Sequence, residues 1–286
     1  MRAIICGIGF FLLAGPSASF AQALPDKFFD ANGVRIRYVE QGTGVAIVLV
    51  PGYMIGLEPW LRTGIFSDLA RDHRVVAYDI RGQGKSDKPH DPAAYRGELT
   101  ADVVRLMGHL GVPKAHIVGY SLGAIIAAKL LTEHPEQFLT ATLGGRAGLR
   151  GFTLETQREI DETAAELESD VPFRSFVQIP QGQAPPDDAE MRRLSAVAGG
   201  NNDPKALAAY WRGGRKSLYT TDAEIASTRV PVLGVVGSLD DVDQMKALKT
   251  LLPAMSLVVI DGATHVSAPR QPAFLQAIRS FITSHE

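Results

Sequence analysis

Near its middle the sequence reads Gly119-Tyr120-Ser121-Leu122-Gly123. The short apolar run His116–Val118 precedes this stretch, and the apolar segment Ala124–Leu131, typical of a buried helix, follows it. G-x-S-x-G between a strand and a helix is the pattern of a sharp turn that exposes a serine hydroxyl. The serine on such a turn has a strained backbone, and the two glycines leave room for strand and helix to approach each other. We therefore interpret Ser121 as a candidate nucleophile.

Short apolar runs rich in valine and isoleucine recur on both sides of this turn and predict strands buried on both faces of a parallel sheet. They are Val45–Val50, Val75–Tyr78, His116–Val118, Val232–Val236 and Leu257–Ile260. Predicted helices separate them, at about Leu99–Leu110, Leu122–Glu133, Asp243–Leu251 and Pro272–Ile282. An Asn32-Gly33 turn within Phe28–Glu40 predicts an antiparallel hairpin ahead of them. This alternation predicts an α/β fold with a mostly parallel central sheet and helices on both faces.

The alternation is interrupted once, between residues 147 and 227. No buried-strand run occurs there, whereas Leu154–Ser169 and a segment around Tyr210 predict helices. An interruption of about 80 residues is too long for a structureless loop. We therefore predict a helical cap at 147–227, inserted into an α/β core formed by 24–146 and 228–286.

The first 23 residues have the three parts of a secretory signal peptide. Arg2 is followed by the apolar run Ala3–Ala14, and Ala21-Gln22-Ala23 supplies an A-x-A cleavage site. The apolar run is too short to cross a bilayer, which needs about 20 residues. We expect an exported protein, periplasmic or secreted, with no stable membrane anchor after cleavage. Its single cysteine, Cys6, would leave with the signal.

Composition excludes several classes of protein. Hydrophobic residues make up 45% and charged residues 21% of the 286 residues, as in folded soluble proteins. The 29 basic and 31 acidic residues nearly balance, and no basic run is interleaved with aromatics, so we expect no nucleic-acid partner. One cysteine rules out a disulfide framework or a thiolate metal cluster within one chain. We expect neither a metal nor a cofactor.

A serine nucleophile needs a base, and in the strand–turn–helix design the base follows the serine in sequence. His134, His265 and His285 are the histidines that follow Ser121 in the sequence. His134 lies 13 residues further along the nucleophile's own helix, roughly 20 Å away at 1.5 Å per residue. His285 is next to the C-terminus. His265, just after the predicted strand 257–260, is therefore the candidate base.

The base needs an orienting carboxylate at the same end of the sheet. Asp240 follows the predicted strand Val232–Val236 and is the candidate acid, with Asp241 as its main competitor. The alternative position for this carboxylate is just before the predicted cap at 147–227. There Leu143-Gly144-Gly145-Arg146 offers no carboxylate.

Acyl transfer also needs two backbone donors for the oxyanion of its tetrahedral intermediate. One candidate is the N–H of Leu122, the residue after the nucleophile. The other is the N–H of Tyr53, in the Pro51-Gly52-Tyr53 loop after Val45–Val50, where the glycine lets the backbone turn. A plain strand-ending turn is the alternative interpretation of this loop.

Together these residues resemble the α/β-hydrolase superfamily over nearly all of the mature chain. Five segments match the family pattern in order: Pro51-Gly52-Tyr53, Asp79–Ser86, Gly119–Gly123, Gly237–Asp240 and Gly262–His265. The resemblance implies the α/β-hydrolase fold and a Ser–Asp–His triad. It gives Asp79–Ser86 a structural role, shaping the neighbouring turn. The family usually has His-Gly where this chain has Pro51-Gly52.

The resemblance also discriminates among functions. Dehalogenases and epoxide hydrolases of this fold carry Asp at the nucleophile position, so Ser121 argues against both. Together with the predicted signal peptide, the resemblance implies an exported serine hydrolase that cleaves a small-molecule or polymeric carboxylic ester through an acyl-enzyme. Carbon–carbon bond hydrolases, lactonases and cofactor-free perhydrolases share the triad and remain alternatives, as does a catalytically silent binding protein. The candidate pocket residues are Trp60, Tyr120, Phe173, Phe176 and Trp211.

Overall fold

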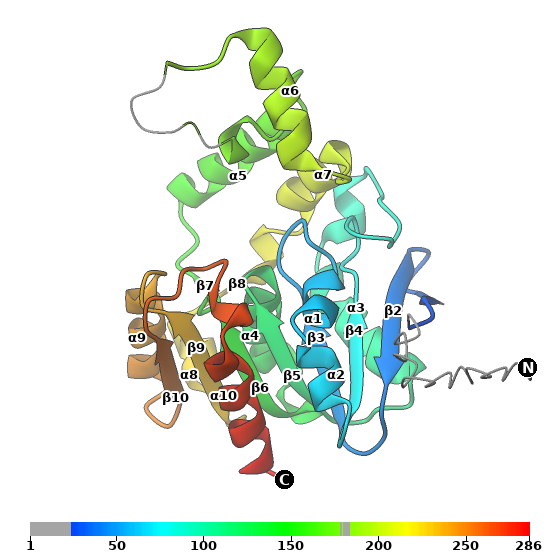
Figure 1. The fold of residues 1–286 in the computed structure, drawn as a ribbon, viewed down its shortest axis with the longest axis vertical. Coiled ribbons are helices and arrows are strands. Elements are labelled where there is room, and N and C mark those ends of the chain that lie inside the picture. The colour runs from blue at the N-terminus through cyan, green and yellow to red at the C-terminus, as the bar shows by residue number, and fades with distance from the viewer. Residues whose placement is uncertain (1–23, 178, 180–183) are drawn as a thin grey trace, which may run out of the picture.

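An eight-stranded sheet forms the centre of the computed structural model, which describes residues 24–177, 179 and 184–286 (Figure 1). The strand order is β1-β2-β4-β3-β5-β6-β9-β10. The bounds are Lys27–Asp30 (β1), Arg35–Gln41 (β2), Ala46–Val50 (β3), Arg74–Tyr78 (β4), Ala115–Tyr120 (β5), Phe138–Gly144 (β6), Val232–Gly237 (β9) and Ser256–Ile260 (β10). Strand β2 pairs antiparallel with β1 and β4, and the other neighbours pair in parallel. The prediction of a mostly parallel α/β sheet is confirmed.

Helices cover both faces of the sheet, as predicted (Figure 1). One face carries α1 (Glu58–Arg62), α2 (Ile65–Leu69) and α10 (Pro272–Thr283). The other carries α3 (Glu98–His109), α4 (Leu122–Glu133), α8 (Asp222–Ala226) and α9 (Val242–Leu251). Side chains alternate between the faces along β3, where Val48 and Val50 pack against the second group and Ile47 and Leu49 against the first. The apolar runs are continuous because both faces are buried.

The hairpin before the parallel strands also forms as predicted. Asn32 and Gly33 have φ angles of 59° and 79°, the left-handed values that the favoured two-residue hairpin turn requires. Ala31 and Val34 exchange backbone hydrogen bonds across this turn. The register that follows pairs Phe29 with Ile36.

Strand β6 is absent from the predicted runs because Thr140 and Thr142 interrupt its apolar residues. Both threonines are nevertheless buried inside the sheet layers. Thr140 is satisfied there by a partner on the neighbouring strand, since its Oγ1 lies 2.8 Å from Nδ1 of His116. A hydroxyl that finds a partner within the core costs little to bury, so the apolar pattern understates how deep this strand lies.

His116 gives the fold a pH-dependent stability. Burial lowers its pKa from 6.5 to about 4, so the folded protein keeps the ring neutral where the unfolded chain takes up a proton. Stability from this residue is complete above pH 6.5 and is lost as pH falls toward 4, by about 3 kcal/mol at 1.4 kcal/mol per pKa unit. Urea unfolding at pH 7 and pH 4 should show a smaller drop for His116→Gln than for the parent protein. Equal drops would contradict this assignment.

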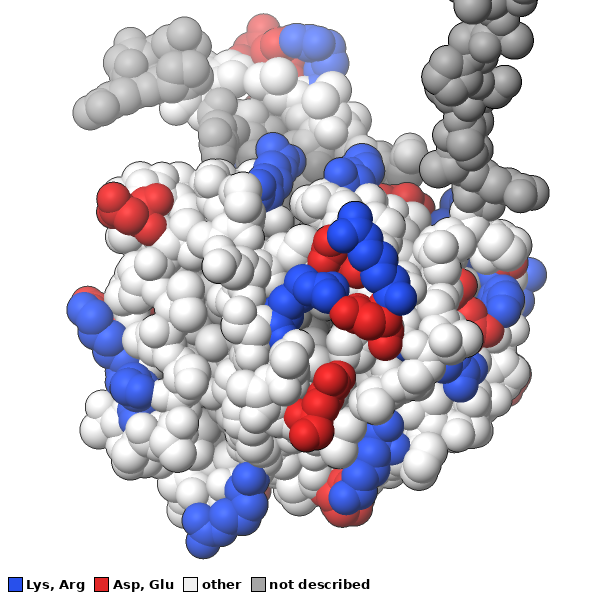
Figure 2. Space-filling model, turned by 60° about the horizontal axis from the view of Figure 1, so that its bottom comes forward, with Lys and Arg blue, Asp and Glu red and all other residues white. Residues whose placement is uncertain are grey.

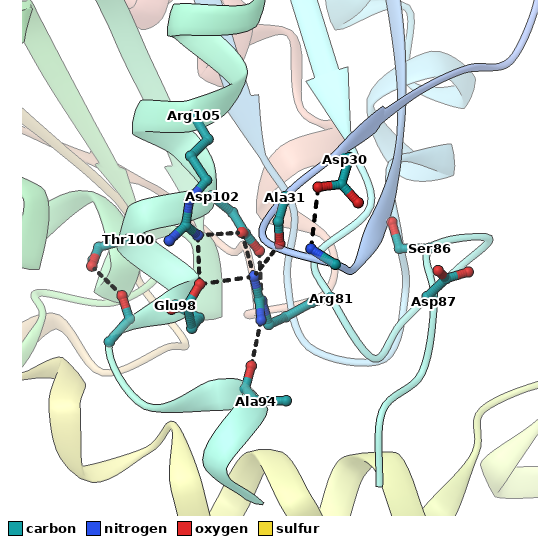
Figure 3. Close-up of polar contacts among 12 residues, drawn as sticks. Asp30, Ala31, Arg81, Ser86, Asp87, Ala94, Glu98, Thr100, Asp102 and Arg105 are labelled. Atoms are coloured by element: carbon teal, nitrogen blue, oxygen red, sulfur yellow. Dashed lines mark hydrogen bonds and ion pairs between the residues drawn. The ribbon is translucent and has the colours of Figure 1, made fainter. Parts of the chain in front are cut away.

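The loop after β4 is tied to α3 by a buried ion pair (Figure 3). Arg81 and Asp102 are each 1% exposed, and Arg81 Nε donates to Asp102 Oδ2 at 2.7 Å while its Nη2 donates to Oδ1 at 2.5 Å. Arg81 also donates to the backbone oxygens of Ala31 and Ala94 and to Glu98. The guanidinium therefore joins the hairpin turn, α3 and the segment before it, and both charges are fully paired.

The segment predicted as a cap carries three helices above the sheet, α5 (Leu154–Leu167), α6 (Asp188–Gly199) and α7 (Pro204–Gly213) (Figure 1). Two short parallel strands, β7 (Leu149–Arg150) and β8 (Tyr219–Thr220), lie where it leaves and rejoins the core. Helices α5 and α7 pack around a small apolar cluster of their own: Ala164, Leu167, Phe173, Leu207 and Ala208.

Helix α6 is not among the predicted helices. Its buried residues are Met191, Ser195 and Gly199, spaced four apart. This face is helical in spacing but narrow and made mostly of small residues, so it carries little of the apolar periodicity by which an amphipathic helix is recognised. Contact with Phe173, whose ring occupies the space of a side chain at Gly199, explains why the face is small.

The expected signal peptide, residues 1–23, lies outside the described residues. Among the helices that are described, none combines the length and apolar character needed to cross a bilayer.

Candidate active site

Ser121 lies on a strained turn between β5 and α4. Its backbone angles are φ 56° and ψ −113°, a left-handed φ that non-glycine residues rarely adopt. The flanking glycines make the turn possible: a Cβ on Gly119 would lie 2.1 Å from the Gly123 oxygen, and one on Gly123 would lie 2.0 Å from the Val50 oxygen. The strain and close approach expected of this stretch are therefore present.

The structure brings Ser121, His265 and Asp240 together in one hydrogen-bonded chain. His265 Nε2 lies 3.0 Å from Ser121 Oγ, and His265 Nδ1 lies 2.7 Å from Asp240 Oδ2. Asp240 follows β9 and His265 follows β10, so parallel strands deliver all three residues to one edge of the sheet. Close packing at Gly237, where a Cβ would lie 2.1 Å from the Ala263 oxygen, fixes the spacing of the two loops.

The geometry distinguishes Asp240 from its competitor Asp241. Asp241 is the N-cap of α9, and its side chain accepts the Gln244 N–H. Burial alone would raise the pKa of Asp240, but the Asp241 N–H, His265 and Arg146 outweigh it and lower the pKa below its usual value. The Asp240 carboxylate is therefore ionised at neutral pH beside the imidazole.

Two backbone N–H groups lie next to the serine. Leu122 begins α4, where the first N–H groups have no helical acceptor. A Cβ on Gly52 would lie 3.5 Å from the Ser121 Cβ, so the loop that carries Tyr53 runs directly past the serine. Within the described parts of the chain, no acceptor is found for the N–H of Tyr53 or of Leu122. Both donors remain available to a ligand oxygen.

Ser121 and His265 open into a cavity of about 730 Å³. Trp60 and Tyr120, two of the five candidate pocket residues, line it. The other three do not: Phe173 is buried in the cluster between α5 and α7, while Phe176 and Trp211 pack around the Tyr53 ring. Of these three aromatics, only Phe173 is fully buried in the core of this segment, whereas Phe176 is 43% exposed.

No metal site accompanies this cavity in the part of the chain that the structure describes. No three His, Cys, Asp or Glu side chains there are grouped to hold a metal ion.

Comparison with known proteins agrees with this arrangement. Residues 45–172 match the family described as alpha/beta hydrolase fold, a match that spans the Tyr53 loop and the Ser121 turn. The chain belongs to the α/β-hydrolase superfamily. Fold alone does not establish an activity, and the similar proteins below have names that describe different reactions.

Three similar proteins illustrate that range. A dihydrolipoyllysine-residue acetyltransferase component of an acetoin cleaving system from Cupriavidus necator is 27% identical over 84% of this chain and 64% of its own length. A 2-hydroxymuconate semialdehyde hydrolase from a Pseudomonas species is 32% identical over 42% of each chain. The crystal structure of a membrane phospholipase A, a bacterial virulence factor, has a TM-score of 0.70, 25% identity and coverage of 91% and 86%. The chain spans less than two thirds of either curated relative.

This α/β hydrolase has one charged residue at the triad that sequence reasoning missed. Arg146 Nη1 lies 3.2 Å from Asp240 Oδ1 and 3.4 Å from His265 Nδ1, and it donates to the Gly145 oxygen. The sequence signal that could have identified Arg146 is its position just after β6, at the carboxyl edge of the sheet. A cation at this edge of the sheet can pair with the triad carboxylate, as Arg146 does with Asp240.

The superfamily's marker segment Asp79–Ser86 forms hydrogen bonds with the loop that carries Tyr53. Gln83 Oε1 accepts the Met54 N–H, and Asp79 accepts the N–H of Leu57 at 2.7 Å. Asp79 also accepts the Lys85 N–H, so one buried carboxylate connects its own loop with the loop beside the serine. The structural role that the resemblance implied is therefore specific: these side chains fix the path of the backbone that follows Tyr53.

The segment predicted as a cap, 147–227, also contacts the loop that carries Tyr53. Trp211 Nε1 donates to the Tyr53 hydroxyl at 2.9 Å, and Asn202 Nδ2 donates to the Met54 oxygen at 3.0 Å. The Tyr53 ring also packs against Tyr210, with ring centres 5.6 Å apart. Residues from 202–211 therefore contact the loop that carries the Tyr53 N–H.

Proposed function

We propose that this protein is an exported hydrolase of carboxylic esters that works through an acyl-enzyme on Ser121. The observation that carries the proposal is the chain from Ser121 Oγ through His265 to Asp240, opening into a cavity beside two unpaired N–H groups. A nucleophile, a base, an orienting acid and oxyanion donors are the complete set of groups that serine acyl transfer requires.

The geometry suits the following sequence of steps. His265 Nε2 takes the proton of Ser121 Oγ as this oxygen bonds to the ester carbonyl carbon. The carbonyl electron pair moves to the oxygen, which accepts the N–H groups of Tyr53 and Leu122. The imidazolium, stabilised by Asp240, returns the proton to the leaving alcohol. Water, deprotonated by His265, then bonds to the acyl carbon; the bond to Ser121 Oγ breaks, His265 returns the proton to this oxygen, and the acid leaves.

The serine favours this proposal over epoxide or haloacid chemistry, since relatives of those types use an aspartate nucleophile. Cleavage of carbon–carbon bonds or lactones, or the perhydrolysis catalysed by cofactor-free perhydrolases, would use the same triad. Carbon–carbon hydrolases accept ring-cleavage products, which are usually handled in the cytoplasm. The proposed export therefore argues against this activity. Esters therefore remain the first substrates to test.

The test is a burst experiment with p-nitrophenyl butyrate and an active-site label. We expect one nitrophenolate per protein molecule in the first turnover, because the acyl-enzyme forms before water cleaves it. A fluorophosphonate should abolish turnover and add its mass to the peptide that contains Ser121. A label on another residue, or turnover that survives complete labelling, would reject the serine mechanism.

Export is tested separately, by isolating the protein from cell fractions and sequencing its N-terminus. The proposal expects a periplasmic or secreted protein that begins at Leu24. Full-length protein in the cytoplasm would reject this part while leaving the ester hydrolase proposal intact.

A further inference from the structure

We infer that the ester substrate carries an anionic group, a carboxylate or a phosphate, which Arg62 and Arg270 bind at the wall of the active-site cavity. This inference rests on the proposed function, since it places a substrate in the cavity of Ser121. It goes further by naming the charge of that substrate and the two residues that select it.

The cavity wall carries an unbalanced charge. Arg62, the last residue of α1, and Arg270, the last residue of the short helix Ala268–Arg270, both line it. No aspartate or glutamate is among the lining residues. Two permanent cations therefore share one cavity with the Ser121 hydroxyl, and the lining itself contains no carboxylate to neutralise them.

Nearby carboxylates are already paired elsewhere. Glu58, on the same helix as Arg62, accepts from Arg37 at 2.8 Å. Asp68 on α2 accepts from Arg279 at 3.0 Å, and Asp240 is occupied by His265 and Arg146. Among the described residues, neither Arg62 nor Arg270 has an acidic group within 4.0 Å, in contrast to most arginines of the molecule.

The charge pattern of the outer surface differs from that of the cavity. On the face drawn in Figure 2, many basic side chains stand beside acidic ones, while others, such as the blue group at the lower left, stand apart on uncharged surface. Such mixed pairs produce little net field beyond about 10 Å at physiological salt. Arg62 and Arg270 are themselves exposed, but they share one concave site, where low-dielectric walls concentrate their field inside the cavity.

The remaining lining indicates how the substrate would be oriented. Trp60 and Tyr120 are apolar and buried, while Ile55 and Val266 add apolar surface that is exposed. An ester in the oxyanion site would place its hydrocarbon part against these side chains and its anion against the arginines. A guanidinium suits either anion because it presents paired donors to carboxylate and phosphate oxygens.

The test compares esters that differ only in the distant charge. The carboxylate pair is mono-p-nitrophenyl suberate and p-nitrophenyl octanoate, and the phosphate pair is a monoacylglycerol phosphate and the monoacylglycerol with the same chain. We expect kcat/KM to favour the charged member of at least one pair by about tenfold, and the favoured pair identifies the anion. The preference should decline between 0.02 M and 0.5 M salt, because screening weakens exposed charges.

Variants assign the preference to the two residues. Each of Arg62→Gln and Arg270→Gln should raise KM for the favoured charged ester about threefold, and the double variant about tenfold, while kcat/KM for p-nitrophenyl octanoate changes less than twofold. Arg192→Gln is the matched control, because Arg192 is an exposed arginine of α6 outside the cavity lining. It removes the same charge and should change neither substrate.

A binding measurement separates this inference from the proposed function. Calorimetry with suberic acid monomethyl ester, glycerol phosphate and methyl octanoate on Ser121→Ala protein requires no turnover. Binding of an anion that the double variant loses supports the inference even if no ester is cleaved. Anions that bind the parent and the double variant equally, or no preference for charge in either assay, overturn it. Octanoate ester cleavage without a charge preference would leave the proposed function standing alone.

Discussion

Ser121→Ala is expected to lower kcat/KM for p-nitrophenyl butyrate by at least about 10⁴-fold. The hydroxyl is the atom that bonds to the substrate, and His265, 3.0 Å away, has no other proton to take along this path. Loss of the serine from a comparable triad costs about 10⁶ in kcat, and what is left comes from the oxyanion donors and binding. KM should change little, because the hydroxyl contributes mainly in the transition state. Rates with purified protein at several ester concentrations separate the two constants.

The matched control for this change is Ser67→Ala, on α2. Its hydroxyl donates only to the Gly64 oxygen and is exposed, so activity should remain within twofold. Circular dichroism and thermal unfolding should show that the Ser121→Ala protein is folded. A decrease of less than tenfold would mean that Ser121 is not the nucleophile, whatever the appearance of the hydrogen-bonded chain.

Arg81→Met is expected to lower the free energy of unfolding by about 3–5 kcal/mol. Methionine fills similar space but leaves the Asp102 carboxylate, 1% exposed, without its two guanidinium contacts. Removing one partner of a buried pair costs this much because the other charge stays buried, here with only Arg105 Nη1, 3.4 Å away, to compensate it. Urea unfolding monitored by tryptophan fluorescence measures the change. The loop after β4 would lose its anchor, so activity should also decline through the Tyr53 loop.

Two further variants show whether the cost comes from the buried charge. Arg105→Met removes an arginine that contacts the same Glu98 and Asp102 but is one third exposed, so it should cost at most about 1 kcal/mol. The double variant Arg81→Met with Asp102→Leu should recover part of the lost stability, since replacing both members with apolar residues removes the unpaired charge. A double variant less stable than Arg81→Met would contradict the role assigned to the pair.

The sequence predicted every strand of the sheet except β6, and the three triad positions, because each depends on local features. A buried parallel strand is a continuous apolar run, and the functional residues follow such runs within about five positions. Ser121, Asp240 and His265 could therefore be placed at one edge of the sheet without any knowledge of tertiary contacts. The structure places them within hydrogen-bonding distance.

Features that depend on partners distant in sequence were missed. Arg146 becomes part of the site only because Asp240, 94 residues later, lies beside it. Helix α6 is specified by the Phe173 ring against Gly199, which no periodicity within the helix reveals. The aromatics assigned to the pocket were identified by type alone, and whether such a residue lines a cavity or a core is decided by what faces it.

The contacts of Trp211 and Asn202 with the Tyr53 loop imply a reciprocal effect. If the Tyr53 N–H binds an oxyanion best while these two contacts are in place, then an oxyanion in turn favours the arrangement in which they are made, by the same free energy. Contact of these two residues with the Tyr53 loop and binding at the catalytic serine would then be one coupled equilibrium. A substrate analogue that touches only Ser121 and the two N–H groups would thus stabilise the contacts that Trp211 and Asn202 make with the Tyr53 loop.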